Sequence, residues 1–139
     1  MYSYAYDMAR NDNDLNTMKE IRGEYVEYMG KMFNHYEAYS SELFGRDIPQ
    51  TLVLTPSRLI TDTADDFFAM AVQRGYSFVT LEEAQNDPAY TTKENFMGKA
   101  GISWFERWSM AKGSPLKSEP EVDPAVKQVW DERQLKAKK

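Results

Sequence analysis

The sequence predicts a helix-rich α/β fold with one parallel βαβ unit and a long N-terminal helix. From about residue 14 to about residue 44, apolar side chains recur at steps of three and four, which indicates an amphipathic helix. Two short apolar runs, residues 51–55 and 76–79, are typical of strands buried on both faces. A second helical pattern lies between them, so the order strand, helix, strand predicts a right-handed parallel unit.

Capping residues predict where these two helices begin and end. Asn13 or Asp14 is expected to cap the long helix, because short polar side chains accept hydrogen bonds from the first free amides. Gly45 is expected just beyond its last turn. We expect Asp62 or Thr63 to cap the second helix, after a loop that follows the first strand.

The remaining signals are short helices and a polar tail. Thr80 and Glu83 have the spacing of a capping box, and a packed helix is expected over residues 102–112. We expect one domain over residues 1–116, followed by a polar, partly helical tail over residues 117–139.

Composition excludes several functional classes. The chain has 139 residues, with 17 basic and 22 acidic side chains and a net charge of −5, which disfavours a nucleic-acid partner. It has no cysteine and a single histidine, His35, so thiolate metal sites and mechanisms that need two histidines drop out. No apolar run predicts a membrane span and the N-terminus does not resemble a secretory signal, so we expect a cytoplasmic protein without a membrane partner.

The two predicted strands pose a difficulty. Two strands do not make a stable sheet in water, and both of these would be edge strands. We therefore expect either a larger fold that covers them or a homo-oligomer that completes the sheet between chains.

Three stretches resemble a known family. They are residues 36–38 with 43–55 (LFGRDIPQTLVLT in the second part), residues 74–84 (RGYSFVTLEEA) with 87–90 (DPAY), and residues 101–104 (GISW) with 107–108 and 112–113. In order and spacing they resemble the C-terminal part of polysaccharide deacetylases of the NodB homology type. The resemblance covers about residues 4–116 and implies a partial β/α barrel, one half of the family's deformed barrel.

The resemblance also shows what these residues lack. The family removes acetyl groups from sugars with a divalent metal, usually zinc, held by one Asp and two His, with a second Asp as base and a His as acid. The resemblance implies that the chain starts after the metal-binding half, and it places Thr55 where the family has the acidic His. A threonine hydroxyl can donate a hydrogen bond but cannot deliver a proton to a leaving group at a useful rate. No metal or other cofactor is therefore expected.

The candidate ligand-binding residues are Thr55, Arg58 and His35. Thr55 and Arg58 follow the first predicted strand, at the end where barrel folds place their sites. His35 could act as a base, although a helix histidine without an orienting partner usually has only a packing role. The acidic side chains Asp62, Asp65 and Asp66 are more typical of the first turn of a helix than of a cation site.

Three functional hypotheses remain open. The first is a non-catalytic, deacetylase-like fragment or pseudo-enzyme that self-associates. The second is an enzyme with a new active site at a subunit interface. The third is one half of a split deacetylase, whose metal-binding half lies on a separate chain.

Overall fold

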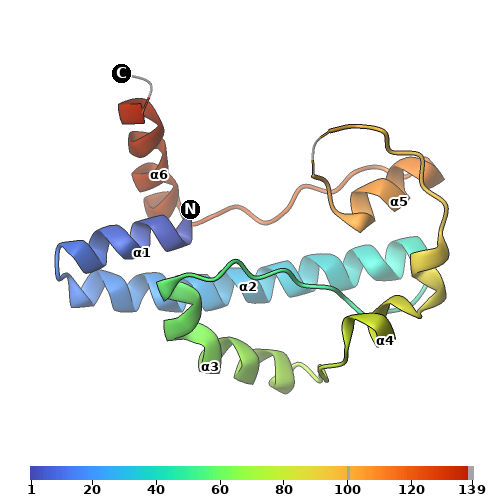
Figure 1. The fold of residues 1–139 in the computed structure, drawn as a ribbon, viewed down its shortest axis with the longest axis horizontal. Helices are drawn as coiled ribbons and strands as arrows, with labels where there is room; N and C mark the ends of the chain where they lie inside the picture. The colour runs from blue at the N-terminus through green and yellow to red at the C-terminus, as the bar shows by residue number, and fades with distance from the viewer. Residues whose placement is uncertain (100, 138–139) are drawn as a thin grey trace. The chain divides into compact units, whose positions relative to one another are not determined.

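The computed structural model describes residues 1–99 and 101–137, and their regular elements are helical (Figure 1). In chain order these are α1 (Tyr2–Asn11), α2 (Leu15–Phe44), α3 (Arg58–Gln73), α4 (Leu81–Gln85), the 3-10 helix η1 (Pro88–Thr91), α5 (Trp104–Lys112) and α6 (Pro124–Ala137). The long helix predicted over about residues 14–44 is confirmed as α2.

Side-chain caps explain where several helices begin. The carboxylate of Asp14 accepts hydrogen bonds from the backbone amide of Thr17 at 3.0 Å and from its hydroxyl at 2.7 Å, which confirms Asp14 as the cap of α2. The predicted capping box of Thr80 and Glu83 is also confirmed, at the start of α4. Gly45 follows α2 with φ +69°, a backbone conformation that costs glycine little.

The predicted βαβ unit is wrong. Residues 51–55 and 76–79 have no strand assignment, and the described residues contain no sheet, so a partial β/α barrel is not the fold of this part of the chain. The predicted burial is wrong as well, because Val53 is 84% exposed and Phe78 is 62% exposed. An apolar run favours the extended conformation, but a strand exists only when a neighbour supplies its backbone hydrogen bonds.

The start of α3 also differs from the prediction. Ser57 is the cap, and its hydroxyl accepts a hydrogen bond from the backbone amide of Ile60 at 3.2 Å. Asp62 and Thr63, which were expected to cap this helix, lie inside it. A serine directly after Pro56 is a good cap, and the apolar pair Leu59–Ile60 belongs to the helix rather than to a loop.

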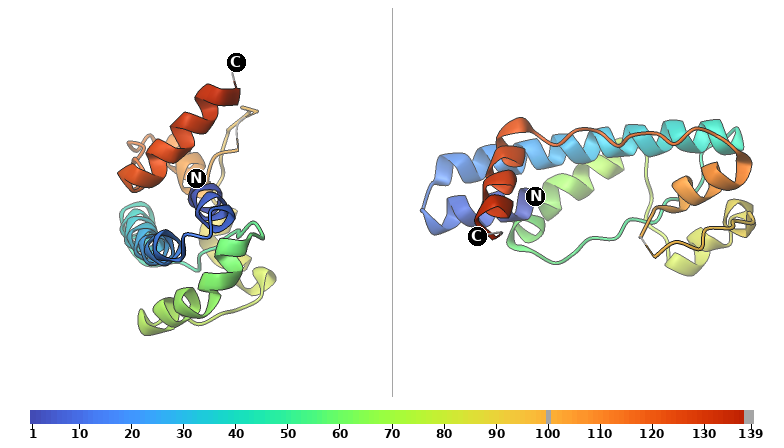
Figure 2. Two further views of the ribbon diagram at one scale, coloured as in Figure 1. Left: turned by 90° about the vertical axis from the view of Figure 1, so that its left-hand side faces the viewer. Right: turned by 90° about the horizontal axis from the view of Figure 1, so that it is seen from above.

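The described residues form two units, each with its own packing. The first takes in residues 1–31, 53–77 and the C-terminal stretch from Pro120, and in it α1 packs against α3 and α6 (Figures 1 and 2). The ring of Tyr2 lies 5.7 Å from that of Tyr25 on α2. The buried Tyr6 donates a hydrogen bond from its hydroxyl to Asp62 at 2.7 Å, which ties α1 to α3.

Aromatic contacts hold α6 in the same unit. Trp130 lies edge-on to Tyr4 at 6.0 Å, and the guanidinium of Arg133 lies 4.3 Å from the centre of the Tyr4 ring. Val126 is buried at the start of the helix. The tail predicted over residues 117–139 is thus helical over Pro124–Ala137, and its residues 138–139 lie outside the described residues.

The second unit takes in residues 32–52 and 78–119. Its buried apolar core consists of Tyr39, Leu43, Ile48, Ala89, Phe105 and Trp108. The hydroxyl of Ser40 fixes the turn after α2, since it donates to the carbonyl of Arg46 at 2.9 Å and accepts from the amide of Ile48 at 3.0 Å. Within the described ranges, no helix has both the length and the apolar character needed to cross a membrane.

Candidate functional site

Residues 48–57, in the segment between α2 and α3, carry no charge, and the apolar run within them includes exposed side chains. No charged residue lies between Asp47 and Arg58, and Pro49 and Pro56 flank the apolar run. Val53 is 84% exposed and Leu52 is 47% exposed. Exposed apolar side chains that follow one another along an extended backbone are typical of a surface that meets another chain.

Hydrogen bonds fix the segment near both of its ends. At the first end, in the second unit, the hydroxyl of Tyr90 donates to the carbonyl of Pro49 at 2.9 Å and lies 3.3 Å from the hydroxyl of Thr51. At the other end, in the first unit, the hydroxyl of Ser3 donates to that of Ser57 at 3.1 Å. Between these ends, residues 51–55 make none of the backbone–backbone hydrogen bonds found outside the helices of the described residues. We call residues 51–55 the free segment.

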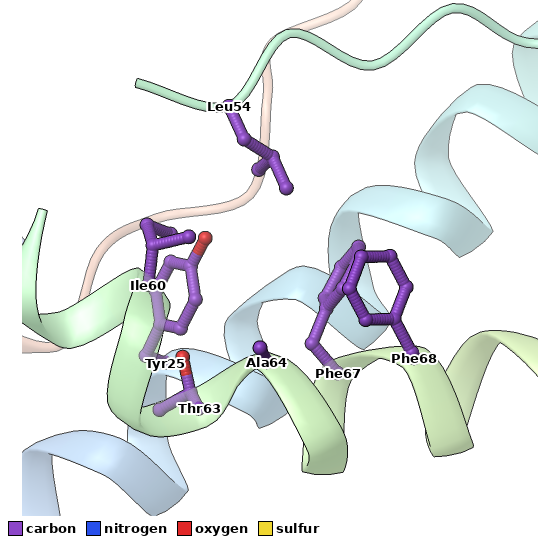
Figure 3. A pocket seen from close by; sticks show the side chains of 7 residues that line it. All are labelled: Tyr25, Leu54, Ile60, Thr63, Ala64, Phe67 and Phe68. Carbon is purple, nitrogen blue, oxygen red and sulfur yellow. The ribbon is translucent and has the colours of Figure 1, made fainter. Parts of the chain in front are cut away.

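A small apolar pocket lies beside this segment, entirely within the first unit. It is lined by Tyr25, Leu54, Ile60, Thr63, Ala64, Phe67 and Phe68. Figure 3 shows Leu54 pointing from the segment toward α3, with Ile60 to one side and Phe67 and Phe68 to the other. The cavity measures about 40 Å³ and is too small for a sugar ring, so it suits the tip of an apolar side chain.

The wall of the pocket formed by α3 was not recognised as a surface from the sequence. Phe67 and Ala71 are buried, but Phe68 is 44% exposed and Val72 is 58% exposed. Residues 60, 64, 68 and 72 are four apart and form a second apolar stripe on the helix. This spacing could have revealed the stripe, had Ile60 been included in the helix.

Thr63 and Tyr25 give the pocket little polar character. The Thr63 hydroxyl is buried and donates to the carbonyl of Leu59 at 2.7 Å within α3. Burial raises the pKa of the Tyr25 hydroxyl, with a smaller contribution from Tyr28, so this phenol stays neutral at physiological pH. The pocket therefore offers apolar contact and no acid or base near neutrality.

Thr55 and Arg58, two of the three predicted ligand-binding residues, lie in the first unit. Both are exposed, Thr55 at the end of the free segment and Arg58 as the first residue of α3. Among the hydrogen bonds and ion pairs of the described residues, none involves either side chain. The two residues lie close in sequence, and neither lines the apolar pocket.

His35, the third predicted residue, lies in the second unit. Its ring is partly buried on α2, edge-on to Tyr36 at 4.9 Å and to Tyr39 at 5.6 Å. A catalytic base needs a hydrogen-bonding group that orients its ring, and these two contacts are made by ring faces and edges. They are the contacts of a packing residue.

The described residues do not fit a zinc site of the kind that the resembled family uses. The described residues hold no cluster of three or more His, Cys, Asp or Glu side chains that could bind a metal. The acidic residues of α3 have structural partners instead: Asp62 accepts from Tyr6 at 2.7 Å, and Asp66 lies 3.5 Å from the guanidinium of Arg22. We therefore derive no chemistry that passes through a metal.

Comparison of the chain with protein-family models, with curated proteins and with solved structures gives no match.

Proposed function

We propose that these 139 residues form a non-catalytic module, similar to part of a polysaccharide deacetylase, that works by associating with another polypeptide chain. The observation that carries the proposal is the free segment 51–55. Its apolar side chains are exposed and its backbone amides lack backbone hydrogen bonds, so both are available to a partner.

The chemistry of the residues supports the non-catalytic part of the proposal. Acetyl hydrolysis requires a group that activates water and a group that protonates the leaving atom. Thr55 stands where the resembled family has its acid, and an aliphatic hydroxyl does not serve as a proton donor near neutrality. His35, the one imidazole, is held among aromatic rings.

An assay of acetate release tests this proposal. The purified chain, with and without added Zn²⁺, is incubated with an N-acetylated chitooligosaccharide and with an aryl acetate. We expect no acetate above the blank, whereas an active deacetylase run in parallel releases it. Release that rises in proportion to the concentration of the chain would contradict a non-catalytic module.

The variant Thr55→His makes the test sharper. It restores the side chain that the resemblance expects at this position, but the described residues still offer no metal cluster. We expect this variant to release no acetate either. Hydrolysis by Thr55→His alone would mean that the missing acid is the only defect, and the proposal would then be wrong.

A split deacetylase is the alternative that the free segment also favours. A separate chain that carries the metal-binding half could pair with the exposed backbone of residues 51–55. Mixing the two chains would then produce acetate release that neither chain shows alone. If release instead appeared only at chain concentrations that favour oligomers, an active site between subunits would be the better explanation.

A further inference from the structure

The free segment reads the same in both directions. Residues 51–55 are Thr-Leu-Val-Leu-Thr, a palindrome centred on Val53. Two copies of such a segment, laid antiparallel about a two-fold axis at Val53, place threonine opposite threonine and leucine opposite leucine. Cross-strand pairs of β-branched and apolar side chains stabilise antiparallel strands, so this register suits pairing of the segment with itself.

Charge does not oppose this pairing. Natural edge strands avoid self-pairing by carrying lysine, an inward-pointing charge or a proline. Here the nearest charges, Asp47 and Arg58, lie outside the run, and the two prolines at 49 and 56 flank it without interrupting it. The segment therefore lacks the features that keep an exposed edge apart from a second copy.

The pocket fits the same arrangement. Side chains two apart on an extended chain share a face, so Leu52 and Leu54 point the same way once the segment is paired. In the register centred on Val53, Leu52 of a second copy lies opposite Leu54 of the first. Leu54 already points toward the apolar stripe of α3, beside Ile60 and Phe68 (Figure 3). Leu52 of the second copy would then cover apolar surface that is exposed in the single chain.

We propose that the partner is a second copy of this chain, joined through antiparallel pairing of residues 51–55 about a two-fold axis at Val53. This inference rests on the proposed function, because it names the partner of the module. A slip of one residue would turn Leu52 and Leu54 of the second copy to the opposite face, away from the α3 helix of the first copy. The pocket therefore supports the same register as the palindrome. An isolated two-stranded ribbon is weak in water, and α3 supplies the apolar surface that supports this one.

Cross-linking of single-cysteine variants tests the register, and it is clean because the native chain has no cysteine. The variants Val53→Cys, Leu52→Cys and Leu54→Cys are each equilibrated in a glutathione redox buffer. The Cα atoms of directly opposed residues in an antiparallel pair lie about 4.5–5.5 Å apart, which a disulfide can bridge. Diagonal neighbours lie about 7–8 Å apart, at or beyond the longest Cα–Cα distance that a disulfide spans.

The inference predicts a pattern rather than a single product. Val53→Cys forms a covalent dimer by itself. Leu52→Cys and Leu54→Cys form little covalent dimer when each is oxidised alone, and they form a covalent heterodimer when they are mixed. Val79→Cys is the matched control, since Val79 is also an exposed apolar residue of an extended segment, and it cross-links at least tenfold less than Val53→Cys.

Molar mass in solution completes the test and keeps the two proposals apart. Light scattering of the unmodified chain across a concentration series is expected to give a dimer. A monomer at every concentration overturns this inference, as does a dimer whose cysteines cross-link outside the 53–53 and 52–54 pattern. Neither result bears on acetate release, which alone decides whether the module is catalytic.

Discussion

Ser109 of α5 donates a hydrogen bond to the hydroxyl of Tyr39 on α2 across 2.7 Å, and both residues are almost completely buried. The bond joins two helices that are 70 positions apart along the chain at this contact. Because water does not reach either hydroxyl, each would lose its partner outright if the other were removed.

We predict that the double variant Tyr39→Phe/Ser109→Ala loses less stability than the sum of the losses of the two single variants. Tyr39→Phe leaves the Ser109 hydroxyl buried without a partner, at a cost of about 1–3 kcal/mol. Adding Ser109→Ala removes the orphaned hydroxyl and recovers part of that cost. Urea unfolding of both single variants and the double variant measures the coupling, and strict additivity would show that the bond contributes nothing.

The cap of α5 gives a second prediction. The Ser103 hydroxyl accepts from the amide of Glu106 at 3.2 Å, while the Glu106 carboxylate accepts from the amide of Ser103 at 2.7 Å. Ser103→Ala is expected to lower the free energy of unfolding by about 1 kcal/mol, because α5 carries Phe105 and Trp108 into the core. Ser103→Thr keeps a capping hydroxyl and should lose much less, so equal losses for both variants would argue against the cap.

The ion pair of Arg46 and Asp87 predicts how stability depends on pH. Two hydrogen bonds, at 2.6 and 2.8 Å, join the guanidinium to the carboxylate and hold the pKa of Asp87 below its usual value of 3.8. A lowered pKa in the folded state gives stability that is present above the pKa of the unfolded chain and is lost as the pH falls through the folded value.

Asp87→Asn should therefore have a lower free energy of unfolding than the native chain at pH 7. This difference in free energy should shrink as the pH falls through the pKa of Asp87 in the folded chain. Urea unfolding at several values of pH measures this difference. Asp131→Asn is the control, since Asp131 is exposed on α6 and should show little difference at any pH. A difference for Asp87→Asn that stays constant down to acid pH would assign the loss to the η1 cap, where Asp87 accepts from the amide of Ala89.

Charge exchange at Val53 gives a fourth prediction, independent of cysteine chemistry. Val53→Lys and Val53→Glu each place two like charges opposite each other at the two-fold axis, so each variant alone should be monomeric. An equimolar mixture pairs lysine with glutamate and should restore dimers, as measured by light scattering. Val53 is 84% exposed, so we expect either change to alter monomer stability by no more than about 0.5 kcal/mol. Dimers formed by Val53→Lys alone would show that the axis lies elsewhere.

The features predicted correctly are those that depend on neighbours in sequence. The cap at Asp14, the capping box at Thr80 and the glycine at 45 all act within one helical turn, and the sequence of that turn contains the whole interaction. The apolar period of α2 is likewise visible over its full length.

The features predicted wrongly depend on partners far along the chain or outside it. Residues 51–55 have the composition of a buried strand, but nothing in that composition specifies which strand lies beside it. The apolar spacing of α3 likewise does not specify which side chains are covered, because Phe68 and Val72 are exposed while Phe67 and Ala71 are buried. The candidate site is thus a part of the molecule where the local preference for extended backbone is strong and no described segment of the chain pairs with it.

The exposure of the free segment makes it a site where proteases can cut the chain. Proteases cut most readily at exposed segments outside regular structure, and residues 51–55 are such a segment, with exposed side chains and no backbone hydrogen bonds. Trypsin has no lysine or arginine to cut between Arg46 and Arg58, but a protease that cleaves beside leucine has two targets, Leu52 and Leu54. The lifetime of the intact chain against such a protease therefore measures how much of the time this segment is covered, and trypsin digestion of the same sample serves as the reference.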